Sequence, residues 1–208
     1  MYIAKLHQET DRAIITRLIE ENGFGLLITT DDTGTPHATH IPMVLEEKAS
    51  GELVLKGHIA RINPQWQWFS KGLSLAVFNA EHAYISASWY EKGKIPTWNY
   101  MAVHLHGTVR IQEEAEVIAS LGGLVDKYEA ASACPVHISE IPAKELDNNV
   151  KAIVGFELTV TDINATFKLS QNKNDADYQS VITHLREIGD ENAIGVVAAM
   201  EARRPQIK

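Results

Sequence analysis

Residues 100–111 are predicted to form a strand whose side chains alternate between apolar and polar from Val103 onward, and this pattern constrains the fold more than any other. Successive residues of a β-strand point to opposite faces of a sheet, so the segment is typical of a strand buried on one face. The apolar face would carry Val103, Leu105, Val109 and Ile111. The polar face would carry His104, His106, Thr108 and Arg110. The chain is therefore expected to build a sheet with one face against a core.

Further strands are predicted on both sides of this segment. They cover residues 24–30, 37–45, 53–60, 73–78, 83–89 and 155–163. A turn at residues 31–34 would join the first two as a hairpin. In residues 53–60, Leu53, Leu55 and Ile59 would face one way, and Lys56 and His58 the other. Closely spaced strands of this kind favour antiparallel pairing in a small barrel.

Helices are predicted at the start of the chain, in crossovers and at its end. The first would have Thr10 as its N-cap and Asp11 in its first turn, before an apolar stripe on Ile14, Ile15, Leu18 and Ile19. The others cover residues 113–131, 143–154 and 175–203, the last broken near Gly189 or Gly195. These patterns predict a mainly β fold with helices (α+β). One domain would cover residues 1–170, with a helical segment, residues 171–208, packed on it.

Composition excludes several classes of protein. Cys134 is the one cysteine, so neither an intramolecular disulfide nor a cysteine-based zinc site can form. The first residues lack the pattern of a secretory signal, and no stretch approaches the roughly 18 apolar residues that span a bilayer. We therefore expect a cytoplasmic protein with no membrane contact. The formal net charge of −8 disfavours direct nucleic-acid binding, which needs a basic surface.

The segment from Lys56 to Pro64 predicts a phosphate site. Lys56 and His58 would project from one face of a strand, and Arg61 follows them. Asn63 and Pro64 would then cap and open a helix whose first backbone N–H groups are unpaired. Fixed positive charge and free N–H donors attract phosphate, although the same residues would also suit an ordinary strand end.

Other candidate sites are weaker. Aromatic residues are dense in residues 84–90 and 96–100, which suits either a planar ligand ring or a core. His104 and His106 would share a strand face, and His37 lies near His40, but no third ligand stands at a telling spacing, so no metal site is predicted. Cys134 lacks a neighbouring fixed cation that would activate a nucleophile.

Five motifs occur in order along the chain. They are Ala38-Thr39-His40-Ile41-Pro42, Gly57-His58-Ile59-Ala60-Arg61-Ile62-Asn63-Pro64-Gln65-Trp66, His82-Ala83-Tyr84-Ile85-Ser86, Pro96-Thr97-Trp98-Asn99-Tyr100 and Lys168-Leu169-Ser170-Gln171-Asn172. This set resembles the PaiB-type family, the FMN-binding negative transcriptional regulators also described as protease synthase and sporulation regulators. The resemblance runs from Met1 to about Val181.

The resemblance implies a split β-barrel, like that of pyridoxamine-phosphate oxidase, that binds FMN at the interface of a homodimer. By similarity, the phosphate would be bound by the segment from His58 to Asn63, which includes Ala60 and Arg61, and Lys56 is the further cofactor-binding candidate from the residue pattern above. The backbone of Thr39, His40 and Ile41 would lie beside the isoalloxazine ring. The flavin would also be approached, from this subunit or its partner, by Trp98, Asn99, Tyr100, Lys168 and Gln171.

The resemblance also implies a regulatory role in transcription, protease synthesis or sporulation. In such a regulator, bound FMN would stabilise a dimer that binds a regulatory protein partner, with DNA as the less favoured alternative. A flavin-dependent oxidoreductase or flavin reductase is the alternative, because FMN supplies electron chemistry and His40, His58 or Tyr100 could donate protons. No acid–base pair follows from spacing, so catalytic residues are not assigned. Haem binding is a second alternative, which related split barrels support and the nine histidines permit.

Overall fold

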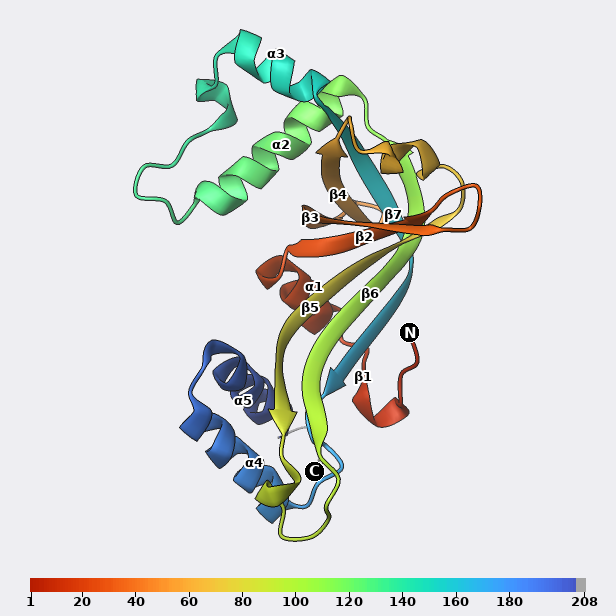
Figure 1. Ribbon diagram of the computed structural model, residues 1–208. Coiled ribbons are helices and arrows are strands. Elements are labelled where there is room, and N and C mark those ends of the chain that lie inside the picture. The colour runs from red at the N-terminus through yellow and green to blue at the C-terminus, as the bar shows by residue number, and fades with distance from the viewer. Residues whose placement is uncertain (205–208) are drawn as a thin grey trace. The chain divides into compact units, whose positions relative to one another are not determined.

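The computed structural model describes residues 1–204, and its strands form one antiparallel sheet (Figure 1). The seven strands follow the order β1-β7-β4-β3-β2-β5-β6, and β6 also pairs with β7. The strands are β1 (Gln8–Glu9), β2 (Phe24–Thr30), β3 (Pro36–Glu47), β4 (Leu53–Ala60), β5 (Leu73–Ile85), β6 (Thr97–Ile111) and β7 (Ile153–Lys168). The α-helices are α1 (Arg12–Glu21), α2 (Glu114–Glu129), α3 (Ala143–Lys151), α4 (Asp175–Ile188) and α5 (Glu191–Arg203). Short 3-10 helices are η1 (Lys5–His7), η2 (Pro64–Trp68), η3 (Ala87–Trp89) and η4 (Ile138–Glu140).

The chain forms two compact units. The first, called the barrel unit, consists of Ile19–Phe78 and Leu105–Ile163. The second, called the terminal unit, consists of Met1–Leu18, Asn79–His104 and Asn164–Lys208. Helices α4 and α5 belong to the terminal unit, together with segments from the start and middle of the chain. The division at residue 170 expected from the sequence stays a prediction.

The barrel unit is built from a closed ring of strands. Because β6 pairs with β7, the strands β7, β4, β3, β2, β5 and β6 follow one another around the ring without a free edge. Antiparallel register places Met43 opposite Gly57, and Gly57 opposite Phe156. A Cβ atom on Gly57 would lie 2.8 Å from the Phe156 ring, so glycine allows these strands to pack closely around the core.

The alternation predicted for residues 53–60 is confirmed. Leu55 and Ile59 are buried inside the ring, whereas Lys56 and His58 are half-buried on its other face. Hydrophobic burial of one face is the reason that this register is fixed, because a slip by one residue would turn the apolar set outward. The rings of Phe69 and Phe156 complete the core edge to face, with centroids 5.3 Å apart.

The terminal unit packs α4 against α5. The N-cap of α4 is Asn174, whose side chain accepts a hydrogen bond from the Asp177 N–H, and the helix ends at Gly189 with a φ of 70°. The predicted break near Gly189 is therefore confirmed, whereas Gly195 lies inside α5. The Tyr178 hydroxyl donates to the Met200 carbonyl over 2.6 Å, which ties the two helices together.

Two predicted segments have different ends in the structure. The helix predicted for residues 143–154 ends at Lys151, and β7 begins at Ile153. Ile153 and Val154 pair with Ala60 and Ile59 of β4, and this long-range pairing overrides the local helical pattern. The separate strands predicted for residues 73–78 and 83–89 are one strand, β5, followed by η3.

Strand β6 confirms the predicted alternation except at its end. Val103, Leu105 and Val109 are buried, as expected. Ile111 was predicted to share their face, but it is 47% exposed. It is the last residue of the strand, where the covering core ends.

The N-cap of α1 is Asp11, so the prediction that Thr10 caps this helix is wrong. The Asp11 carboxylate accepts hydrogen bonds from the N–H groups of Ala13 at 2.9 Å and Ile14 at 3.3 Å. Asp11→Ala is therefore expected to lower the free energy of unfolding by about 1 kcal/mol, the usual cost of losing a cap. Thr10→Ala is the matched control and should change it by less than about 0.5 kcal/mol. Urea unfolding followed by circular dichroism measures both, and equal losses would contradict the assignment.

Two further observations concern the cysteine and the possibility of a membrane-spanning helix. Cys134 is exposed, in the connection between α2 and α3. Over residues 1–204, none of the helices has the length and hydropathy needed to cross a membrane.

Candidate functional site

Thr39, Asn63 and Gln65 form a polar cluster in the barrel unit. The Thr39 hydroxyl donates to the Gln65 side-chain carbonyl over 2.5 Å and accepts from the Asn63 amide over 2.9 Å. Gln65 is 1% exposed, and its amide donates to the main-chain carbonyls of Leu27 and His37. The structure thus brings together two residues predicted for different parts of the flavin, Thr39 and Asn63. Gln65 was not predicted as part of the site.

The helix predicted after Asn63 is shorter than expected. Asn63 is its N-cap, as predicted, and accepts a hydrogen bond from the Gln65 N–H over 3.0 Å. Pro64 opens the helix, also as predicted, but η2 is a 3-10 helix of 5 residues. Such a short helix has no substantial dipole, and the Asn63 side chain already binds one of its N–H groups. Helix donors therefore contribute little to an anion site here.

Arg61 lies just after β4 and is held by main-chain carbonyls. Its Nε donates to the Lys151 carbonyl over 2.8 Å and its Nη2 to the Ile153 carbonyl over 2.7 Å. Both acceptors flank the junction of α3 and β7. Within residues 1–204, no carboxylate lies at ion-pair distance from Arg61. The guanidinium is thus fixed in direction, exposed, and not neutralised by a neighbour.

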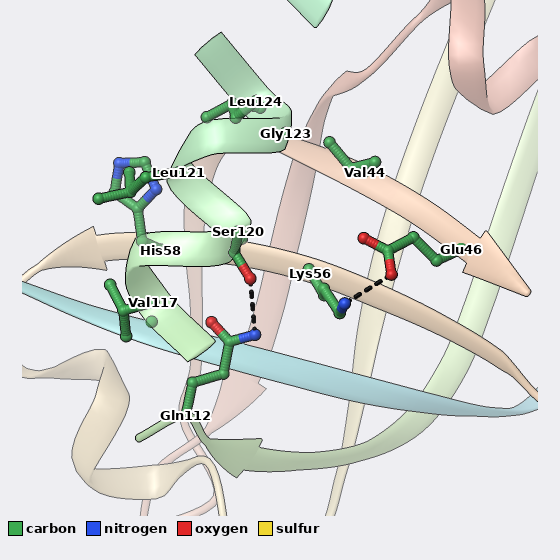
Figure 2. Close-up of a pocket in the computed structure, with 12 residues that line it drawn as sticks. Val44, Glu46, Lys56, His58, Gln112, Val117, Ser120, Leu121, Gly123 and Leu124 are labelled. Atoms are coloured by element: carbon green, nitrogen blue, oxygen red, sulfur yellow. Dashed lines mark hydrogen bonds and ion pairs between the residues drawn. The ribbon is translucent and has the colours of Figure 1, made fainter. Parts of the chain in front are cut away.

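Lys56 and His58 lie in a narrow cleft between α2 and the sheet, which we call the His58 cleft. Its volume is about 20 Å³, enough for one or two water molecules. Figure 2 shows both side chains with Glu46, Gln112 and Ser120. Lys56 Nζ pairs with the Glu46 carboxylate at 2.5 Å. Burial lowers the pKa of His58, so the imidazole is neutral at neutral pH and adds no fixed positive charge.

A larger cleft lies next to the His58 cleft, and we call it the Trp66 cleft. It has a volume of about 150 Å³ and lies against η2, α2, α3 and the start of β7. It shares Gln112, Val117 and Gly155 with the His58 cleft. Its remaining lining residues are Arg61, Trp66, Ile111, Glu114, Val150, Lys151, Ile153 and Val154. Arg61 is therefore the predicted phosphate ligand that faces the larger space.

Gln112 is a residue that the sequence did not reveal. It is 7% exposed, and its Nε2 donates to the Ser120 hydroxyl over 2.9 Å. Its Oε1 is buried and accepts no hydrogen bond from residues 1–204. A Cβ on Gly155 would lie 2.8 Å from this oxygen, so glycine makes the space that the amide occupies. The only local signal is its position directly after the predicted strand at residues 100–111.

The buried carboxylate of Glu157 lies beside Lys56, its partner on β4, and binds two other basic residues. The Glu157 side chain is 4% exposed, and its Oε1 accepts from Lys48 Nζ at 2.9 Å and from Arg110 Nε at 3.2 Å. Burial alone would raise the pKa of Glu157, but the hydrogen bonds from Lys48 and Arg110 outweigh it and the pKa lies below its usual value. Lys48 also pairs with Glu52 and Arg110 with Glu116, so both cations are neutralised by carboxylates, in contrast to Arg61.

The remaining predicted residues on β3 and β4 have varied surroundings. His40 is exposed, and its ring stacks on that of Phe24 with centroids 6.0 Å apart. Ile41 is buried in the barrel core, so only its backbone could contact a ring, as the resemblance implies. Ala60 is exposed at the end of β4.

A second group of predicted residues lies in the terminal unit. Asn99 is wholly buried, where its Oδ1 accepts from the Ser170 hydroxyl and its Nδ2 contacts Met200 Sδ. Gln171 accepts from the Leu169 N–H and donates to the Phe167 carbonyl. These two side chains therefore stabilise the segment after β7, and their contact with flavin stays a prediction.

Trp98, Tyr100 and Lys168 are more accessible. Trp98 is 52% exposed and lies against Tyr84, with ring centroids 5.8 Å apart. Tyr100 is half-buried, and Lys168 donates to the Thr97 hydroxyl. Trp98 and Tyr84 form an exposed aromatic surface, as the aromatic motifs allow, and its ligand stays a prediction.

The donor set around Arg61 fits a phosphate group. The guanidinium offers charge and several N–H donors in a fixed plane, which suits phosphate oxygens. Asn63 adds the second N–H of its amide near the end of β4, and Thr39, whose hydroxyl donates to Gln65, holds that amide in place. The polar chemistry needed to bind the phosphate of FMN is therefore present in the barrel unit.

Comparison with known sequences agrees with this chemistry. A model of the family described as "Putative FMN-binding domain" matches residues 1–162. The chain is 40% identical over 202 residues to the Protease synthase and sporulation protein PAI 2 of Bacillus subtilis, covering 97% of each chain. It is 27% identical over 230 residues to an uncharacterized protein of Emericella nidulans, covering 91% of this chain and 92% of that one.

Solved structures show the same fold at lower identity. The FAD and haem binding protein of Mycobacterium smegmatis matches with a TM-score of 0.60 and 17% identity, over 78% of this chain and 73% of that chain. The flavocytochrome Anf3 of Azotobacter vinelandii matches with a TM-score of 0.60 and 15% identity, over 86% and 78%. The predicted fold class, α+β with a split barrel of the flavin-binding type, is confirmed. The chain belongs to the PaiB-type family of FMN-binding proteins, and FMN is the cofactor of that family.

Proposed function

We propose that this chain binds FMN as a homodimer and regulates protease synthesis and sporulation through a protein partner. The observation that carries the proposal is Arg61, an exposed guanidinium fixed by two carbonyls and left without a carboxylate within residues 1–204. A guanidinium held in a fixed direction is pre-organised to bind an anion, because little side-chain entropy is lost on binding. The phosphate of FMN would satisfy it.

Asn63, positioned by Thr39, would complete the phosphate site. Their mutual hydrogen bond fixes both side chains at the end of β4, so little conformational entropy is lost when an anion binds. His58 is neutral and would act as a hydrogen-bond donor or acceptor rather than as a charge. Bound FMN would supply one- or two-electron redox chemistry, and these residues would orient it.

Dimerisation is supported by an apolar residue beside this site. Ile62 lies between Arg61 and Asn63 in sequence and is 94% exposed. An interface with a second chain would bury this side chain from water, which favours association. Light scattering of the purified protein, with and without FMN, would test this, and a monomeric mass under both conditions would contradict it.

The regulatory role rests on the relative. The Bacillus subtilis protein is named for protease synthesis and sporulation, and the two chains align over nearly their full lengths. The net charge of −8 argues against direct DNA contact, so we infer that regulation acts through another protein. A gel-shift assay at low salt would oppose this inference if the protein bound DNA alone.

Arg61→Ala is expected to weaken FMN binding by about 10- to 100-fold, the usual value of a charged hydrogen bond to phosphate. The dissociation constant is measured by titration of flavin absorbance or fluorescence. Because Arg61 also binds the carbonyls of Lys151 and Ile153, the thermal midpoint of the variant must be measured alongside. Arg186→Ala is the matched control, since Arg186 is an exposed arginine that pairs with Glu201 in the terminal unit. Equal FMN affinity in the two variants would refute the assignment of Arg61.

A visible absorption spectrum of the purified protein tests the cofactor directly. A flavin spectrum with tight rebinding of FMN supports the proposal. A Soret band on addition of haem, with no flavin binding, would favour haem as the ligand. Oxidation of a reduced nicotinamide cofactor by the FMN-loaded protein would favour an oxidoreductase over a regulator without catalytic activity.

A further inference from the structure

The Trp66 cleft has an apolar wall, of which Ile111 is the exposed part. Ile111 is 47% exposed at the end of β6, and Val117, Val150 and Val154 line the same space. The volume of about 150 Å³ corresponds to about ten water-sized groups. A ligand of that size with a short aliphatic body would bury Ile111 from water, with the three buried valines behind it.

One side of the cleft presents a fixed cation. Two N–H groups of Arg61 bind the carbonyls of Lys151 and Ile153, which themselves line the cleft. The other N–H groups of the guanidinium remain for a ligand, because arginine carries five donors in a plane. A planar fork of this kind matches a carboxylate.

A hydrogen-bond acceptor is also present and lacks a donor. Gln112 Oε1 is buried and unpartnered within residues 1–204, while the Ser120 hydroxyl fixes the other end of the amide. Figure 2 shows the amide nitrogen turned toward Ser120 and the oxygen turned away from it. Glu114 adds a second acceptor at the cleft. A ligand with N–H donors would satisfy this buried oxygen, which is otherwise costly to leave unbound.

We propose that the Trp66 cleft binds a free aliphatic α-amino acid, of which leucine is the probe. The carboxylate would bind Arg61, the ammonium would donate to Gln112 Oε1 and Glu114, and the aliphatic side chain would pack on Ile111, Val117 and Val150. The volume of the cleft limits the size of the ligand, Arg61 selects for a carboxylate, and the unpartnered Gln112 Oε1 selects for an N–H donor. The site does not need FMN, but its carboxylate end shares Arg61 with the proposed phosphate site, so the two ligands compete.

Isothermal titration calorimetry on the full-length chain without flavin tests the site. Leucine is expected to bind. 4-Methylpentanoate lacks the ammonium and 3-methylbutylamine lacks the carboxylate, and each should bind at least about tenfold more weakly, since each loses charged hydrogen bonds. Absence of leucine binding, or equal affinity for all three compounds, would overturn the proposal.

Variants separate the roles of the lining residues. Gln112→Met removes the acceptor and should weaken leucine binding at least about tenfold. Ser120→Ala removes the partner of the amide nitrogen but keeps Oε1, so it should weaken binding less than about threefold. Ile111→Trp fills the cleft from an exposed position that tolerates a large side chain, and it should abolish leucine binding while FMN affinity is unchanged. Wild-type leucine affinity in either Gln112→Met or Ile111→Trp would place the ligand elsewhere.

A second titration distinguishes this proposal from the function proposed above. Saturating leucine should raise the dissociation constant for FMN, and FMN should raise that for leucine by the same factor. Leucine binding with no effect on FMN would overturn the shared role of Arg61. Failure of FMN to bind at all would refute the flavin site while leaving the leucine titration, measured without flavin, as an independent result.

Discussion

Gly107→Ala is expected to lower the free energy of unfolding by about 3 kcal/mol or more, because the new methyl group would overlap main-chain atoms. Gly107 lies on β6 where this strand passes β7 in the barrel unit. A Cβ at this position would lie 2.2 Å from the Thr159 carbonyl oxygen and 2.5 Å from Leu158 Cδ2. A carbonyl oxygen cannot move aside as a flexible side chain can, so the strands must separate. The variant therefore tests whether the ring of strands is closed between β6 and β7.

Gly123→Ala is the matched control for this substitution. Gly123 lies inside α2, and a Cβ there would have no atom within 4 Å. Alanine in a helix interior is favoured over glycine by about 0.5–1 kcal/mol, so this variant should be more stable than the parent. Urea unfolding monitored by far-ultraviolet circular dichroism measures both. A loss below about 1 kcal/mol for Gly107→Ala would mean that β6 and β7 are not in close contact.

Glu157→Gln is expected to lower the free energy of unfolding by about 2–3 kcal/mol at pH 7, because two cations lose the negative charge of a buried carboxylate and keep only a neutral amide as acceptor. Lys48 and Arg110 both bind Glu157 Oε1, whereas Glu52 binds only Lys48 and is 44% exposed. Glu52→Gln is therefore the control, with an expected change of less than about 0.5 kcal/mol. Equal losses in the two variants would contradict the special role of the buried carboxylate.

The same carboxylate gives stability a dependence on pH. The pKa of Glu157 in the folded protein lies below its ordinary value of 4.5, because Lys48 and Arg110 outweigh the effect of burial. A carboxylate of this kind contributes stability above its pKa in the unfolded chain, and the contribution is lost as the pH falls through its folded pKa. Urea midpoints measured from pH 7 downward should therefore fall more steeply below pH 4.5 in the parent than in Glu157→Gln.

Strands could be predicted from the sequence where their apolar residues are continuous or alternate regularly, and their bounds were wrong where polar residues interrupt that pattern. Residues 53–60 were predicted with the bounds of β4 because one face is apolar throughout. In β5, Asn79, Glu81 and His82 interrupt the pattern, so one strand was predicted as two. The helix predicted for residues 143–154 was too long because Ile153 and Val154 continue its apolar pattern, and only their pairing with β4 makes them part of β7.

The residues of the proposed phosphate site could be predicted from their sequence motifs, but their hydrogen-bond partners could not. Asn63 and Pro64 were assigned as cap and first helical residue, and both are confirmed. The sequence did not indicate that Arg61 binds the carbonyls of Lys151 and Ile153, residues about ninety positions away. Gln65 and Gln112 were missed for the same reason, since a buried amide is recognised by its long-range partners and not by its neighbours in sequence.

Because Cys134 is exposed, the protein has a single site for thiol-specific labelling. A maleimide dye or nitroxide label would react at that one residue, because no other thiol exists in the chain. In a homodimer the two labels define one interchain distance, which pulsed electron resonance can measure while FMN or leucine is added. The wild-type chain can therefore report its own assembly and ligand response without an engineered cysteine.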